Sequence, residues 1–72
     1  MEKSTDIKLR DEYIKLGQAL KAAGIADSGV DAKFLIQDGK VLVNGQVELQ
    51  RGKKLHDGDE VICRDVTVKI HS

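Results

Sequence analysis

Arg51, Lys53 and Lys54 place three positive charges within four consecutive positions of this chain. The composition does not explain this basic cluster, because 12 lysines and arginines are balanced by 12 aspartates and glutamates. Lysine and arginine side chains bind phosphates, and each nucleic-acid phosphate that they neutralise releases condensed counterions. Gly52, inside the cluster, lets the backbone approach a ligand closely. We therefore expect a phosphate-binding edge at 51–54.

Four other polar residues are candidates for the same surface: Lys15, Lys33, Lys40 and Asn44. A lysine taken singly is more often an ordinary solvated residue than a ligand contact. The concentration of charge at 51–54 is therefore what favours binding. Asn44 precedes Gly45, and the geometry of a tight turn explains this pair better than a ligand contact does.

The residue types argue against a structural metal site and against catalysis. Cys63 is the single cysteine, and together with His56 and His71 it falls short of the four ligands of a structural zinc site. Catalysis needs a nucleophile with a base, or paired carboxylates in a cleft, and neither can be assembled here. We expect no enzyme activity and no cofactor, with Cys63 buried as a small hydrophobe and both histidines at the surface.

Length and composition indicate one small domain over residues 1–72. Zero net charge argues against a polybasic binder, and the two aromatic residues, Tyr13 and Phe34, are too few for an aromatic base-stacking platform. The N-terminal segment has no apolar signal-peptide core, and no later run reaches membrane-spanning length. We expect a cytoplasmic protein whose affinity for nucleic acid comes from a local patch.

A first short helix is predicted over 17–23. Its apolar residues recur at spacings of three and four, at Leu16, Ala19, Leu20 and Ala23. Gly24 follows as a typical residue just beyond a helix C-terminus.

A second helix is predicted from Ser28 to Gly39. Ser28 and Asp31 resemble a capping box, in which each side chain accepts a hydrogen bond from a free backbone N–H. Val30, Phe34 and Leu35 are expected on the buried face of this helix.

Alternating apolar residues predict strands on both sides of the helices. One or two short strands fit 5–16. A hairpin is predicted about Asn44-Gly45, with Val41 and Val43 facing Val47 and Leu49 across the turn. Two further strands follow, the first with Val61 and Cys63 and the second with Val66, Val68 and Ile70. The basic cluster is then expected on a loop between two strands.

These elements predict an α+β fold. Two short adjacent helices should pack on a small, mainly antiparallel sheet that has an extra N-terminal strand. The expected core contains Leu20, Phe34, Leu35, Val43 and Val61.

The order of these elements, together with four short motifs, resembles the alpha-L RNA-binding domain, the family named for ribosomal protein S-four. The motifs are Lys15-Leu16-Gly17, Ser28-Gly29-Val30-Asp31-Ala32-Lys33, Gly39-Lys40-Val41-Leu42-Val43-Asn44-Gly45 and Gly58-Asp59-Glu60-Val61. The match runs over about 15–63. Each motif alone is common, whereas their order and spacing are specific to the family.

Two positions depart from the family pattern, since Gly17 stands where aspartate is usual and Gly29 where arginine is usual. The Ser28-Gly29 pair, the basic cluster and the N-terminal strand look like the small stand-alone bacterial members. These are similar to a domain appended to tyrosyl-tRNA synthetases and pseudouridine synthases.

The resemblance implies a non-catalytic, monomeric module that recognises structured RNA, ribosomal or transfer RNA, by shape and phosphates. The expected RNA contacts are Lys15, Lys33, Lys40, Asn44, Arg51, Lys53 and Lys54. The alternative is a protein-interaction domain that kept the fold and lost its affinity for RNA. Neutral net charge and the glycine at position 29 are consistent with that alternative.

Overall fold

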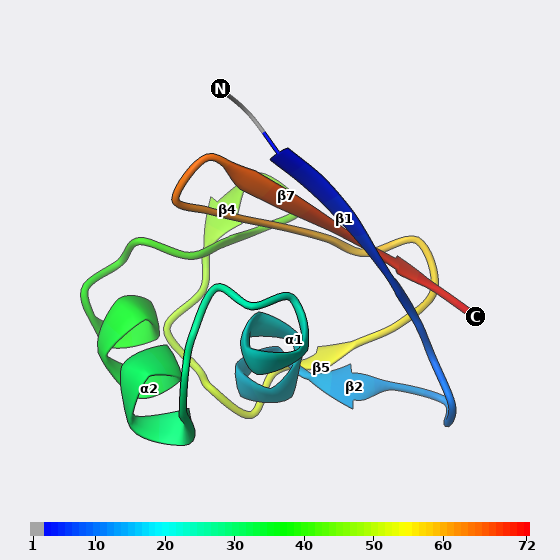
Figure 1. Ribbon diagram of the computed structural model, residues 1–72, viewed down its shortest axis with the longest axis horizontal. Helices are drawn as coiled ribbons and strands as arrows, with labels where there is room; N and C mark the ends of the chain where they lie inside the picture. Colours follow the sequence, from blue (N-terminus) through cyan, green and yellow to red (C-terminus); the bar gives the residue numbers. More distant parts are fainter. Residues whose placement is uncertain (1–2) are drawn as a thin grey trace.

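A five-stranded sheet pairs the first strand of the chain with the last. The computed structural model describes residues 3–72, and its main sheet has the strand order β1-β7-β6-β3-β4. The strands are β1 (Lys3–Lys8), β3 (Leu42–Val43), β4 (Gln46–Val47), β6 (Glu60–Cys63) and β7 (Val66–His71). Neighbours are antiparallel except β1 and β7, which are parallel. The predicted extra N-terminal strand thus lies at one edge, beside the last strand (Figure 1).

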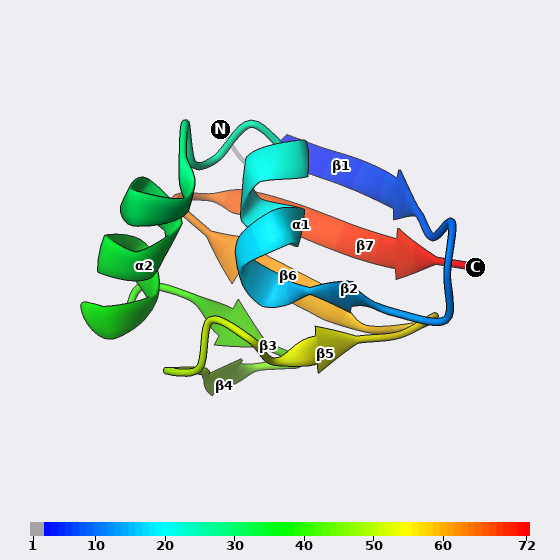
Figure 2. The same ribbon diagram turned by 90° about the horizontal axis from the view of Figure 1, so that it is seen from below.

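Two helices and a two-stranded ribbon cover one face of this sheet (Figure 1 and Figure 2). The helices are α1 (Leu16–Ala22) and α2 (Gly29–Gln37), and they contact each other. The ribbon pairs β2 (Ile14–Lys15) with β5 (Lys54–Leu55) in antiparallel register. The predicted α+β architecture is therefore confirmed. None of the helices in the described part of the chain is long and apolar enough to cross a membrane.

The main sheet contains two hairpins, and in each of them the two strands are joined by a turn with positive φ at both central residues. Asn44 and Gly45, with φ of 52° and 85°, join β3 to β4, while Arg64 and Asp65, at 52° and 64°, join β6 to β7. The twist of such turns matches the twist of paired strands. Asn-Gly is a strong sequence signal for this turn, whereas Arg-Asp is a weak one.

The core lies between the sheet and the helices. Its most deeply buried side chains come from both helices, the ribbon and the main sheet: Leu16, Ala19, Leu20, Ala32, Ile36, Val41, Leu55, Val61, Cys63, Val68 and Ile70. The expected burial of Leu20, Leu35, Val43 and Val61 is confirmed. Cys63 is buried as expected, and burial raises the pKa of its thiol, although the nearby charges of Arg64 and Lys40 act in the opposite direction.

The predicted buried face of α2 is wrong for two of its three residues. Val30 and Phe34 are 60% and 59% exposed, and Ala32 and Ile36 join Leu35 in the core instead. Both sets of residues have helical spacing, so periodicity fits two faces of this helix. Packing against the rest of the core selects the face with Ala32 and Ile36.

Two expectations about the segment 47–55 are also corrected. Val47 does not face Val43 across the hairpin, because Val47 pairs with Leu42 and Val43 pairs with Gln46. Val47 and Leu49 therefore lie at the surface, while Val41 and Val43 are buried. The basic cluster does not lie wholly on a loop, since Lys54 belongs to β5 and the next residue, Leu55, is fully buried.

A polar clasp of Asn44 and Asp59 joins the first hairpin to the start of β6. The Asn44 amide donates to Asp59 Oδ1 at 3.0 Å and accepts from the Glu60 N–H at 2.9 Å. Asp59 Oδ2 accepts from the His56 N–H at 2.7 Å. Partial burial acts to raise the pKa of Asp59, but these hydrogen bonds and the charges of His56 and Lys53 outweigh it and lower the pKa.

Alanine substitutions at one exposed and one buried position of α2 test which face of this helix packs on the core. Phe34→Ala should change the free energy of unfolding by less than about 1 kcal/mol, because its ring is largely solvated. Leu35→Ala, one residue away, should cost about 2–5 kcal/mol, because it empties a core position. Urea denaturation of both variants measures this, and equal losses would contradict the assignment.

Asn44 substitutions should separate turn geometry from hydrogen bonding. Asn44→Gly keeps the positive φ but loses both clasp bonds, so it should cost about 1–3 kcal/mol. Asn44→Ala should cost more, because alanine is also strained at positive φ. Chemical denaturation of both variants measures the difference, and equal costs would show that the turn geometry contributes nothing.

The same clasp should make stability depend on pH. The folded-state pKa of Asp59 lies below its unfolded value, so its stabilisation is present above the unfolded pKa and is lost as pH falls through the folded one. Asn44→Gly removes one of the bonds that lower this pKa. The free energy of unfolding should therefore fall less between neutral and acid pH in Asn44→Gly than in the wild type.

Candidate nucleic-acid interface

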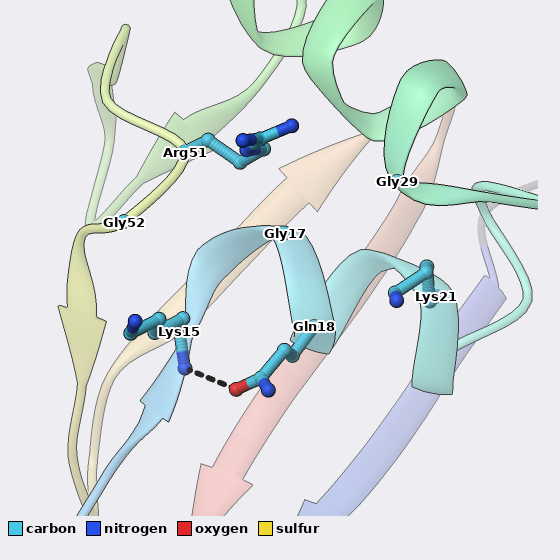
Figure 3. A pocket seen from close by; sticks show the side chains of 7 residues that line it. All are labelled: Lys15, Gly17, Gln18, Lys21, Gly29, Arg51 and Gly52. Atoms are coloured by element: carbon cyan, nitrogen blue, oxygen red, sulfur yellow. Dashed lines mark hydrogen bonds between the residues drawn. The ribbon is translucent and has the colours of Figure 1, made fainter.

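A hollow of about 330 Å³ opens between α1, the first residue of α2 and the loop before β5. Figure 3 shows the residues that line this basic pocket: Lys15, Gly17, Gln18, Lys21, Gly29, Arg51 and Gly52. Three of them are cations, and none of the described lining residues is an aspartate or glutamate. The pocket therefore favours an anion.

Backbone hydrogen bonds hold the loop against the start of α1. The Leu16 N–H donates to the Lys53 carbonyl at 2.8 Å, and the Gly17 N–H donates to the Arg51 carbonyl at 3.1 Å. These two N–H groups lie in the first turn of the helix, where they have no partner within the helix. The bonds satisfy both groups and fix where the Arg51 side chain leaves the loop.

Gly17 gives the Arg51 side chain room to pass over the helix start. A β-carbon at position 17 would lie 2.8 Å from Arg51 Cγ, closer than real β-carbon contacts, and 3.3 Å from Cδ, which is tight. With glycine there, the Arg51 chain crosses above Gly17 and its guanidinium extends toward α2 (Figure 3). The close approach explains why this small residue suits the position.

Residues along α1 and in the first turn of α2 complete the wall. The Lys15 N–H donates to Gln18 Oε1 at 3.3 Å, and Lys21 lies one turn further along α1. At the start of α2, Ser28 Oγ accepts from the Asp31 N–H at 3.2 Å, which is one half of the predicted capping box. Gly29 lines the pocket, and apart from its chain neighbours and the backbone of its own helix, no heavy atom of the described chain comes within 4 Å of the place where its β-carbon would be.

The structure brings together some of the residues predicted from the sequence. Lys15 and Arg51 line the basic pocket, and Lys21 joins them, although sequence reasoning missed it. Its position three residues after Gln18, on the same face of the helix, was the available signal. Gln18 was missed as well.

Two residues of the basic cluster have different neighbours. Arg51 lines the pocket, whereas the Lys54 ammonium lies 4.8 Å from the centroid of the Tyr13 ring. The charge of Lys53 acts to lower the pKa of Asp59. Of the three, only Arg51 lines the pocket, and a common phosphate-binding edge of Arg51, Lys53 and Lys54 stays a prediction.

The remaining candidates lie outside the pocket. Lys33 is exposed on α2, one turn beyond Gly29. Lys40 lies between α2 and β3, where its charge acts to lower the pKa of Cys63. The Asn44 amide is occupied by its bonds to Asp59 and Glu60.

The histidine side chains are exposed, as expected, and each lies near an aspartate. His71 Nε2 is 3.0 Å from Asp6 Oδ1, and His56 Nδ1 is 3.9 Å from Asp59 Oδ2. Over residues 3–72, no group of three or more histidine, cysteine, aspartate or glutamate side chains is placed to hold a metal ion.

Two comparisons relate the chain to known proteins. A family model described as S4 domain matches residues 7–71. A protein of Bacillus subtilis (strain 168), described as "Probable ribosome maturation protein RlbA", is 44% identical over 55 residues. That alignment covers 76% of this chain and 78% of the Bacillus protein.

A double-mutant cycle on Gly17 and Arg51 tests the close approach of the two residues. Gly17→Ala should be unfavourable in the wild type, because the new methyl group forces the Arg51 side chain to shift. In an Arg51→Ala background the same change should stabilise the helix by about 0.5–1 kcal/mol, because alanine replaces a flexible glycine. Chemical denaturation of the four proteins gives the coupling free energy, expected at about 0.5–3 kcal/mol. Additive effects would contradict the contact.

Proposed function

The chain belongs to the S4 domain family, and from this premise we propose that it is a non-catalytic module that binds structured ribosomal RNA through the basic pocket. One observation carries the proposal: Lys15, Lys21 and Arg51 surround one hollow whose described lining includes no carboxylate. The RNA-binding role that the sequence motifs imply for this family supports the same conclusion.

The pocket chemistry suits an RNA backbone phosphate. The planar guanidinium of Arg51 can donate two parallel hydrogen bonds to phosphate oxygens, while Lys15 and Lys21 act as mobile point charges. Double-stranded RNA is recognised mostly by its shape and by backbone contacts, which such a pocket can supply. The chain has no net charge, so aspartates and glutamates outside the pocket repel phosphates there. RNA binding is then confined to the side of the molecule that carries the pocket.

The description of the Bacillus relative favours ribosomal over transfer RNA, because it names a ribosome maturation protein. We infer that this chain acts as a monomer in the cytoplasm, on RNA that is being assembled into ribosomes. Lys33, Lys53 and Lys54 would add weaker phosphate contacts around the pocket. Lys40 and Asn44 receive no RNA contact in this assignment.

Exposed apolar side chains favour the alternative, a surface for another protein. Val30 and Phe34 on α2, and Val47 and Leu49 near β4, are each more than half exposed. Scattered apolar residues are nevertheless common on protein surfaces. Whether the purified protein carries nucleic acid at low salt and loses it at high salt distinguishes the two functions.

Neutralising the pocket should weaken RNA binding and flatten its dependence on salt. We would change Lys15, Lys21 and Arg51 to glutamine and measure the Kd for a ribosomal stem–loop RNA at several salt concentrations. The slope of log affinity against log salt should fall by up to about 0.7–0.9 for each phosphate that is no longer neutralised. Stability should change little, because exposed charges contribute little to folding.

The matched control changes Lys3, Arg64 and Lys69, which do not line the pocket, to glutamine. Equal loss of affinity in both triple variants would show that RNA binds by nonspecific electrostatic attraction and would contradict the pocket as the binding site. Unchanged affinity in the pocket variant would also refute the proposal. Gly29→Arg should have the opposite effect on RNA affinity. Open space at this position admits a fourth cation, so the affinity should rise.

A further inference from the structure

A second hollow, of about 470 Å³, shares the residue Gln18 with the basic pocket. Its lining residues belong to the end of β1, the connection to β2, β2 itself and α1, and Figure 2 shows where these elements lie. Ile7, Leu9 and Ile14 form an apolar floor, since each is partly buried against the core. The Tyr13 ring, 37% exposed, lines the same hollow.

We propose that this hollow receives one unstacked nucleobase of the RNA whose phosphates occupy the basic pocket. The inference rests on the proposed function and extends it from phosphates to a base. Nucleobases offer a flat apolar face, and proteins that bind single-stranded RNA stack such faces on aromatic side chains beside a charged groove. An apolar floor with one tyrosine wall matches that chemistry better than it matches a phosphate.

The charges around the hollow suit a base with its backbone outside. Lys8 and Arg10 line it, together with Asp11. The Asp11 carboxylate can accept a hydrogen bond from a base that carries an exocyclic amino group, while Lys8 and Arg10 can pair with the backbone phosphate of the same nucleotide. The Gln18 side chain accepts from the Lys15 N–H through Oε1, which leaves its NH₂ group to donate to the ligand.

The ribbon connects this hollow to the basic pocket. Lys15 and Lys54 are cross-strand partners of β2 and β5, and the Lys54 ammonium lies 4.8 Å from the Tyr13 ring centroid. The His56 ring is 6.2 Å from the same ring, at 50° to it. A nucleotide with its base against Tyr13 would therefore have its phosphate beside Lys54 and Lys15, on the way to the basic pocket.

Two RNA probes separate base binding from phosphate binding: a stem–loop with an unpaired loop, and a blunt duplex with the same number of phosphates. Tyr13→Ala should weaken binding of the stem–loop by about 5- to 150-fold, the effect of removing one stacking partner, and leave the duplex affinity unchanged. Tyr13→Phe should retain the wild-type affinity for both. The matched control is Phe34→Ala, which removes an exposed aromatic ring that lines neither hollow.

A fluorescence measurement adds a readout that does not depend on affinity. The chain has one tyrosine and no tryptophan, so Tyr13→Trp carries a single tryptophan at the proposed site. Its emission should be quenched by the stem–loop and not by the duplex.

Each outcome bears on a different claim. Equal loss of affinity for both probes in Tyr13→Ala, or unchanged affinity for the stem–loop, would overturn the base site. If the pocket variant bound both probes more weakly while Tyr13→Ala bound them as the wild type does, phosphate binding would stand and the base site would fail. If the wild type bound neither RNA at low salt, both would fail.

Discussion

The start of α1 depends on acceptors that come from a distant part of the chain. The Leu16 and Gly17 N–H groups bond to the carbonyls of Lys53 and Arg51, and β5 then continues directly into its pairing with β2. Ribbon, loop and helix therefore form one unit. The position of Arg51 beside Lys15 and Lys21 follows from these bonds, since they fix the backbone from which each side chain leaves.

This unit gathers cations without a high net charge. The chain is neutral, yet the described lining of the basic pocket holds three cations and no acid. The proposed preference for an anion thus depends on where the charges are placed, because oriented charges around a hollow concentrate their field there. Gln18 then stands between a surface suited to phosphate and a surface suited to an apolar ring.

Several features could be predicted from residue types and local spacing. Asn44-Gly45 predicts a tight turn with positive φ, and the alternation around Val61 and Val68 predicts paired strands. The two helices and the burial of Cys63 were predicted as well. Each of these depends on backbone preferences or on a short periodic pattern, so neighbouring residues suffice to specify it. The motifs that resemble the S4 domain added the order of the elements.

Other features were decided by contacts between segments far apart in the chain. On α2, Phe34 and Ile36 both fit a helical apolar stripe, and packing against the rest of the core buried Ile36. The ribbon strands contain two residues each and exist because each pairs with the other, so neither has a periodic pattern of its own. Lys21 on α1, Gly29 on α2 and Arg51 in the loop before β5 line the same pocket. Local sequence carries charge and turn chemistry, whereas the pocket requires the relative placement of three segments, which tertiary packing alone determines.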